Sequence, residues 1–251
     1  HGRPARPHLQ HGRLSHAVLT LHQKPIALVV KLADRLHNLE TIQALPVHDQ
    51  KRSASTTLNL FAPLADRLGM RYVRRQLADL SLALLNPETW STLQKQCRNA
   101  RVDQEVESVC GELERKMGNR LPNRRMRWQP NPIYGLYRRQ LERRNECFKP
   151  LETGRFIITV DTDEELDCYR VLGTLHQLYA PIDGEFHDFI GAPKKNGYRS
   201  LHTRVKYQPG IALDIVIRTR QMDLVAEFGV TAQWYGGTEG LPQLPAAPKL
   251  M

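Results

Sequence analysis

Hydrophobic residues in the first half of the chain recur with a helical period. Two sets are spaced three and four residues apart, which places their side chains on one face of a helix. They are Leu28, Leu32, Leu36 and Leu39, followed by Leu58, Phe61, Ala65 and Leu68. Gly69 is typical of a helix end, and Asn86-Pro87 of a helix start that opens a long amphipathic segment from Pro87 to Met117. We therefore expect residues 14–118 to be entirely helical.

The pattern changes after residue 118. Prolines in the segment 118–132 predict a boundary between domains. Helices are predicted over residues 133–144, 163–179 and 222–234, and the second carries Leu166, Tyr169, Leu172 and Leu175 on one face. Apolar, β-branched runs predict strands over residues 156–160, 201–207 and 211–217. This order of elements predicts an α+β fold with helices packed against a mixed sheet.

The composition is that of a globular protein with one or two domains. The chain has 251 residues, of which 41% are hydrophobic, and lacks an apolar run of about 18 residues that could span a membrane. Residues 1–13 indicate a disordered or truncated end and residues 241–251 a Pro-rich tail, which leaves a helical region at 14–118 and an α+β domain at 119–240. The four cysteines are Cys97, Cys110, Cys147 and Cys168. They are too widely spaced for a zinc ribbon or a C-x-x-C redox motif, and this pattern indicates a protein of the reducing cytoplasm.

Positive charge is concentrated in one part of the chain. The formal net charge is +10, and residues 120–149 hold nine basic side chains against two acidic ones. Trp128, Tyr134 and Tyr137 alternate with these charges. Such a segment favours a polyanionic partner, either the phosphates of a nucleotide or RNA, although a solvated helix face has a similar pattern.

The segment 191–203 has the residues of a phosphate- and base-binding loop. Lys194 and Lys195 supply positive charge, and Asn196-Gly197 forms a turn in which a positive φ lets the backbone approach a ligand. Tyr198 offers a flat surface on which a base could stack. An Asn-Gly pair between polar runs is also a common hairpin turn, so this segment alone leaves both interpretations open.

Several blocks in a fixed order resemble the RelA/SpoT family of alarmone synthetases. In the α+β part, residues 193–203 are similar to the guanosine-nucleotide loop of that family and residues 133–139 to the helix after its ATP loop. Residues 214–219 are similar to its acidic strand motif and residues 225–234 to its closing helix. Residues 31–38 and 61–69 resemble the late part of its HD-type hydrolase domain and the helix after it. The resemblance covers roughly residues 14–237 and implies the remnant of an HD-type domain followed by a nucleotidyltransferase-like synthetase domain.

The resemblance implies transfer of pyrophosphate from ATP to the 3′-hydroxyl of GTP or GDP, which makes the stringent-response alarmones pppGpp and ppGpp. Mg²⁺ would neutralise charge on the transferred group. Asp214 would take a catalytic and Mg²⁺-binding role, with Glu152 as the nearest carboxylate to the other acidic position, although it lies only three residues before Arg155. The resemblance implies that the guanosine nucleotide contacts Lys194, Lys195, Asn196, Tyr198, His202 and Arg218. For ATP the remaining basic candidates are Arg127, Arg138 and Arg139.

The donor side departs from the family pattern. Gln129-Pro130-Asn131 stands where the family has Arg-x-Lys, which removes two positive charges where a triphosphate needs them. Three functions stay open: an active GTP pyrophosphokinase with an altered donor site, a degenerate domain that binds guanosine nucleotide and regulates, or transfer of pyrophosphate to an RNA end. The partners expected are ATP and GTP, GDP or ppGpp, with a possible contact to the ribosome or RNA and none to a membrane.

Hydrolase activity is not expected from this chain. An HD-type site needs a His, an adjoining His-Asp pair and a distal Asp to hold its metal, and only the distal residue, Asp34, is present. His48-Asp49 is a His-Asp dipeptide, but it lies in a Pro-flanked loop after the wrong helix.

Overall fold

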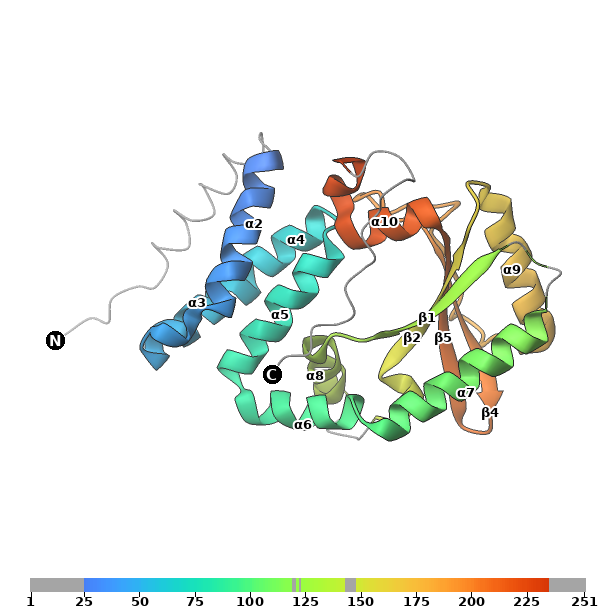
Figure 1. Ribbon diagram of the computed structural model, residues 1–251, viewed down its shortest axis with the longest axis horizontal. Coiled ribbons are helices and arrows are strands. Elements are labelled where there is room, and N and C mark those ends of the chain that lie inside the picture. Colours follow the sequence, from blue (N-terminus) through green and yellow to red (C-terminus); the bar gives the residue numbers. More distant parts are fainter. Residues whose placement is uncertain (1–24, 119–120, 122, 143–147, 235–251) are drawn as a thin grey trace. The chain divides into compact units, whose positions relative to one another are not determined.

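The computed structural model describes residues 25–118, 121, 123–142 and 148–234 and divides the chain into two compact units (Figure 1). Unit 1 comprises residues 1–67, 72–99 and 131–148, and unit 2 comprises residues 68–71, 100–130 and 149–251. The expected loose ends at 1–13 and 241–251 lie outside the described residues.

Unit 1 is helical, as the hydrophobic period predicts. Its elements are α2 (Pro25–Glu40), η1 (Ile42–Ala44), α3 (Val47–Thr56), η2 (Thr57–Phe61), α4 (Ala62–Arg67), most of α5 (Arg71–Leu85), α6 (Pro87–Cys97) and α8 (Ile133–Glu142). Leu28, Leu32 and Leu39 are buried, which confirms the apolar face of the first helix. The predicted helix start at residue 86 is also confirmed, because the Asn86 side chain accepts a hydrogen bond from the backbone N–H of Thr89.

The single helix expected from Pro87 to Met117 is wrong. The structure has two helices there, because α6 ends at Cys97 and α7 (Ala100–Met117) begins after a break. The Asn99 amide donates to the carbonyl oxygens of Lys95 and Gln96, which satisfies acceptors that the end of α6 leaves open. Apolar periodicity continues across the break, and so the pattern alone does not reveal it.

Unit 2 is built on a mixed five-stranded sheet in the order β1-β2-β5-β4-β3, which confirms the α+β prediction. Its strands are β1 (Arg124–Pro130), β2 (Gly154–Val160), β3 (His187–Asp188), β4 (Leu201–Gln208) and β5 (Ile211–Thr219). β2 and β5 are parallel and the other pairs antiparallel. β1 lies within the segment 118–132, for which the sequence predicted a domain boundary and no strand, and its Met126 and Trp128 pack against the core.

Helices α7 and α9 (Glu165–Leu178) cover one face of this sheet (Figure 1). Leu113 of α7 and Leu175 of α9 are buried with Phe156 and Ile215 of the strands. Leu166 was expected on this face but is 58% exposed, since it lies in the first turn of α9 and points away from the sheet. Tyr169, Leu172 and Leu175 do pack on the core as predicted.

The closing helix is shorter than the predicted 222–234. α10 (Arg220–Phe228) begins where the Thr219 hydroxyl accepts a hydrogen bond from the N–H of Met222. It ends at Gly229, whose φ of 57° breaks the helical path before a 3₁₀ turn, η4 (Gly229–Trp234). A further short turn, η3 (Pro150–Glu152), precedes β2.

Each unit has a buried free thiol among the described residues. Cys97 packs in unit 1 beside Leu82 and Leu93, and Cys168 lies in the core of unit 2. Burial raises the pKa of Cys97 to about 11 and that of Cys168 to about 12. Within the described part of the chain, no helix is both long and apolar enough to cross a bilayer.

Candidate functional site

The face of the sheet opposite α7 and α9 is polar. Side chains alternate along a strand, so residues between the core positions of β1, β2, β4 and β5 point to this face, which we call the polar sheet face. The pairing register places Gln129 opposite Arg155, and Asp214 opposite Arg204. Arg155 and Asp214 directly precede the paired residues Phe156 and Ile215. The four side chains therefore form one row across four strands: Gln129, Arg155, Asp214 and Arg204.

The loop before β4 has the predicted tight turn. The N–H of Gly197 donates to the carbonyl oxygen of Lys194, and the N–H of Tyr198 donates to the Asn196 side chain. Gly197 has a φ of 77°, which confirms the expected positive φ. Lys194 and Lys195 are exposed beside this turn.

Tyr198 and His202 lie at the centre of a group of cations. The Tyr198 hydroxyl is 2.7 Å from Nε2 of His202, and the Arg71 guanidinium lies 5.0 Å from the Tyr198 ring centroid. Burial, followed by the charges of Arg155, Arg71, Arg218 and Lys194, lowers the pKa of His202 to about 3. The imidazole is therefore neutral at pH 7, while the surrounding positive charges favour an anion.

Arg218, expected to contact the guanosine nucleotide, is held by two carboxylates of α10. Its side chain is 2% exposed and lies 2.5 Å from Asp223 and 3.2 Å from Glu227. Burial lowers the pKa of Arg218, but the two carboxylates and Tyr198 raise it more, so the net shift is upward.

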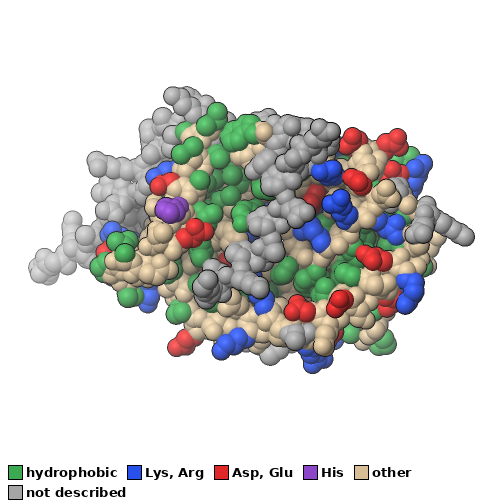
Figure 2. Space-filling view, in the orientation of Figure 1, with side chains coloured by type: hydrophobic (Ala, Val, Ile, Leu, Met, Phe, Trp, Pro, Cys, Tyr) green, Lys and Arg blue, Asp and Glu red, His purple; other side chains and the backbone are tan. Residues whose placement is uncertain are grey.

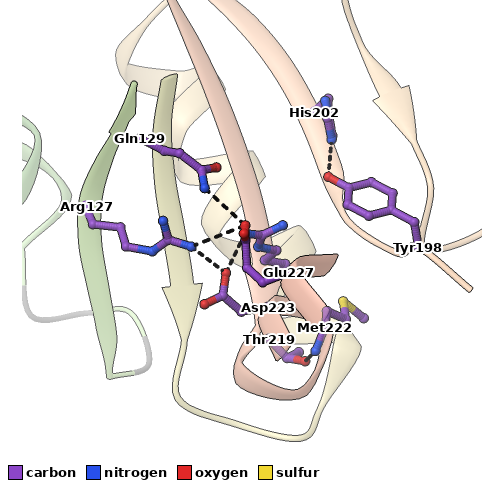
Figure 3. A network of polar contacts seen from close by, with 9 residues as sticks. Arg127, Gln129, Tyr198, His202, Thr219, Met222, Asp223 and Glu227 are labelled. Carbon is purple, nitrogen blue, oxygen red and sulfur yellow. Dashed lines mark hydrogen bonds and ion pairs between the residues drawn. The ribbon is translucent and has the colours of Figure 1, made fainter. Parts of the chain in front are cut away.

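The same carboxylates bind residues of β1. Arg127, a candidate for ATP, lies 2.8 Å from Asp223, and the Gln129 amide donates to Glu227 over 3.1 Å (Figure 3). Two carboxylates thus neutralise two arginines on this part of the polar sheet face. The other ATP candidates, Arg138 and Arg139, lie on α8 of unit 1, where Arg139 is 5.8 Å from the Phe148 ring.

The two carboxylates expected to hold Mg²⁺ have other partners. Asp214 lies 3.3 Å from Nε of Arg204 and interacts with Arg155. Glu152 ends η3 and accepts a hydrogen bond from the N–H of Lys149. Among the residues that the structure describes, no three His, Cys, Asp or Glu side chains are grouped as metal ligands. Because its immediate neighbours are cationic, the surroundings of Asp214 do not fit a divalent cation.

In unit 1 the candidate metal ligands of the expected HD remnant, Asp34 and His48, are exposed. Asp34 forms an ion pair with Lys31 over 3.0 Å, and that contact lowers the pKa of Asp34. The side chain of His48 is 84% exposed and lies 3.6 Å from Asp49.

Sequence reasoning missed four residues that define the site: Arg71, Arg155, Arg204 and Asp223. Arg155 and Arg204 each lie directly before a buried apolar residue, Phe156 and Val205, and this alternation signals that the arginines point to the other face. Nothing local to Arg71 indicates that it lies over Tyr198, since the two are far apart in the sequence.

Known proteins resemble both regions of the chain. The sequence profile "Region found in RelA / SpoT proteins" matches residues 153–239, and the "HD domain" profile matches residues 10–71. A probable guanosine-3′,5′-bis(diphosphate) 3′-pyrophosphohydrolase of Synechocystis is 37% identical over 84% of this chain and 29% of its own length. The corresponding pyrophosphohydrolase of Haemophilus influenzae is 32% identical, over 86% of this chain and 32% of its own.

A GTP pyrophosphokinase, rsh, of Brucella ovis is 33% identical over 89% of this chain and 30% of its own length. The chain thus spans about a third of the length of these relatives. Among solved structures, the small alarmone synthetase 1 of Bacillus subtilis bound to its product pppGpp has a TM-score of 0.41 and 18% identity, over 59% of this chain and 82% of that one. Because that similarity is low, the assignment rests on the sequence matches.

The matches and the fold define a chain in two parts, in which a helical region that matches the HD-domain profile precedes a mixed sheet that matches the RelA/SpoT profile. The chain belongs to the RelA/SpoT family. Its relatives include proteins named as hydrolases and proteins named as pyrophosphokinases.

Proposed function

We propose that this chain takes part in alarmone metabolism and that the polar sheet face binds a guanosine 5′-diphosphate, 5′-triphosphate or ppGpp. The observation that carries this proposal is the group of three cations around the Tyr198–His202 pair, beside the neutralised Arg218: Arg71, Arg155 and Lys194. Guanidinium groups bind phosphate oxygens through paired N–H donors, and the neutral imidazole is able to hydrogen-bond a ribose or base.

Stacking of the base requires a movement. Tyr198 is 4% exposed, and Arg71 lies over its ring. A charge-assisted bond from Arg71 to phosphate is stronger than its cation–π contact with the ring. We expect the nucleotide to draw Arg71 away from Tyr198 and so to free the ring for the base.

Pyrophosphate transfer is the second candidate function. The observation in its favour is the place of Asp214, which lies in the same row as Arg155, next to the cation group. A carboxylate there could orient or deprotonate the attacking 3′-hydroxyl once it leaves Arg204. Gln129 is bound to Glu227 and supplies no positive charge to the ATP triphosphate, which makes nucleotide binding the leading proposal.

An RNA acceptor has less support. The basic residues of segment 120–149 do not share one unit, since Arg127 belongs to unit 2 and Arg138 to unit 1. Figure 2 shows basic and acidic side chains interspersed over the coloured part of the face it draws. RNA binding favours a continuous basic surface.

Calorimetry with GDP, GTP and ppGpp tests the leading proposal. Arg155→Gln should weaken binding at least about tenfold, because it removes a half-buried cation of the phosphate-binding group. Arg170→Gln is the control, since Arg170 is also ion-paired but lies on α9, on the opposite sheet face. The proposal fails if the wild-type chain binds none of the three nucleotides, or if both variants bind as it does.

Incubation with radiolabelled ATP and GTP or GDP tests the second candidate. A pppGpp or ppGpp product that disappears in Asp214→Asn would support transfer. Nucleotide binding without any product would exclude pyrophosphate transfer by this chain and leave nucleotide binding as its function.

A further inference from the structure

Two arginines flank the carboxylate of Asp214 in one row of the polar sheet face. Arg204 pairs with Asp214 in the β4–β5 register, and its Nε lies 3.3 Å from Oδ1. On the β2 side, burial and the charge of Arg71 lower the pKa of Arg155, and the charge of Asp214 opposes that shift. Asp214 therefore has a guanidinium on each side along the row.

Arg204 also borders open space. It lines a cavity of about 540 Å³ together with Glu152, Lys206 and the turn at 208–210. Its Nε is buried and makes no hydrogen bond with the described residues, because the 3.3 Å contact with Asp214 is an ion pair without hydrogen-bond geometry. The Arg204 side chain as a whole is 27% exposed, and a guanidinium carries further N–H donors besides Nε, which leaves these donors for a ligand in the cavity.

We propose that Arg204 takes the place of a divalent cation at Asp214, so that the phosphates of the nucleotide are held by Arg204 and Arg155 without Mg²⁺. This inference rests on the proposed nucleotide binding. The inference concerns how the negative charge of the phosphates is neutralised. The cations that do so are side chains of this chain.

The charge distribution supports this substitution in two ways. A metal ion approaching Asp214 would be repelled by both neighbouring guanidinium groups, whereas a phosphate would be attracted by both. A guanidinium also presents planar, paired donors that match two phosphate oxygens at once. Because a nucleotide complexed with Mg²⁺ carries less negative charge, the free nucleotide should bind at least as tightly as the complex.

Calorimetry with ppGpp as the probe, in EDTA and in excess Mg²⁺, tests the inference. The wild-type chain should bind ppGpp in EDTA as tightly as in Mg²⁺ or more tightly. Arg204→Gln should weaken binding in EDTA at least about tenfold, and Arg170→Gln should leave it unchanged. Asp214→Asn should strengthen binding several-fold, because it removes the carboxylate that competes with phosphate for both arginines.

The sign of the Asp214→Asn effect separates the possibilities. Binding that requires Mg²⁺ and is lost in Asp214→Asn would overturn the inference and leave the proposed function in place. Failure of the wild-type chain to bind in either condition would overturn the proposed function itself. Thermal unfolding shows whether each variant is folded. Arg204→Gln should weaken binding of ppGpp and Asp214→Asn should strengthen it, so a general loss of structure cannot produce both results.

Discussion

At the scale of single residues, His202 shows how the cation group affects stability. Its folded pKa of about 3 lies below the ordinary value for histidine, so the unfolded chain takes up a proton that the folded chain does not. The stability associated with the neutral imidazole is fully present above about pH 6.5 and is lost as the pH falls toward about 3.

We therefore predict that His202→Gln reduces the acid sensitivity of the chain. Between about pH 6.5 and pH 4 the wild-type free energy of unfolding should fall on the order of 1–3 kcal/mol more than that of the variant. Urea denaturation across this range measures the difference. His187→Gln, an exposed position, is the control, and parallel curves for wild type and His202→Gln would contradict the prediction.

Glu227 gives a second prediction at this scale. It is 1% exposed and contacts both Arg218 and Gln129, so Glu227→Gln leaves the buried Arg218 with Asp223 alone. Loss of a partner from a buried ion pair is strongly destabilising, and we expect a cost of about 2–4 kcal/mol. Chemical denaturation measures the free energy of unfolding, and Glu164→Gln, at an exposed position, should leave it unchanged. A similar loss of stability in both variants would argue against a role for the Arg218–Glu227 ion pair.

At the scale of elements, the end of α10 fixes the segment that carries Arg71. A Cβ on Gly229 would lie 2.1 Å from the carbonyl oxygen of Leu68 and 2.7 Å from the N of Met70. The N–H of Val230 also donates to the carbonyl oxygen of Leu68. This close approach of two backbones holds residues 68–71 against the end of α10 within unit 2.

Gly229→Ala should therefore destabilise the chain by about 3 kcal/mol or more, through backbone collision and a positive φ. Gly173→Ala is a matched control, because Gly173 is inside α9 with no atom within 4 Å of an added Cβ. That change should stabilise by about 0.5–1 kcal/mol. Thermal unfolding of both variants is the measurement, and equal midpoints would refute the argument.

The sequence predicted helices and strands where apolar residues recur with a regular period. It missed elements where charged residues or prolines interrupt that period. Strand β1 was not predicted, because prolines lie near its ends and arginines make up much of its sequence. Only Met126 and Trp128 mark the face that packs on the core. The tight turn before β4 was predicted because its signal is local, with Asn196 and Gly197 adjacent. The pairing of Arg204 with Asp214 depends on strand register, which no short motif specifies.

At the scale of the whole molecule, relatives named as hydrolases raise the question of a second activity. The only His-Asp dipeptides in the sequence are His48-Asp49 and His187-Asp188. The first is exposed, and Asp188 of the second accepts hydrogen bonds from Tyr169 and from the backbone of Ile190 and Gly191. Neither fits a metal site completed by Asp34.

We predict that this chain releases no pyrophosphate from ppGpp in the presence of Mn²⁺. The measurement is product formation compared with a protein-free reaction. Release that disappears in Asp34→Asn would show that a hydrolase site does assemble.

The two buried thiols make each unit separately observable. Alkylating reagents attack the thiolate. Cys97 and Cys168 are buried and have raised pKa values, so we expect each to react when its own unit opens. Mass spectrometry of the two cysteine peptides would thus record two opening rates in one sample. A nucleotide that binds unit 2 alone should slow alkylation of Cys168 and leave that of Cys97 unchanged, which would locate the binding unit without any substitution.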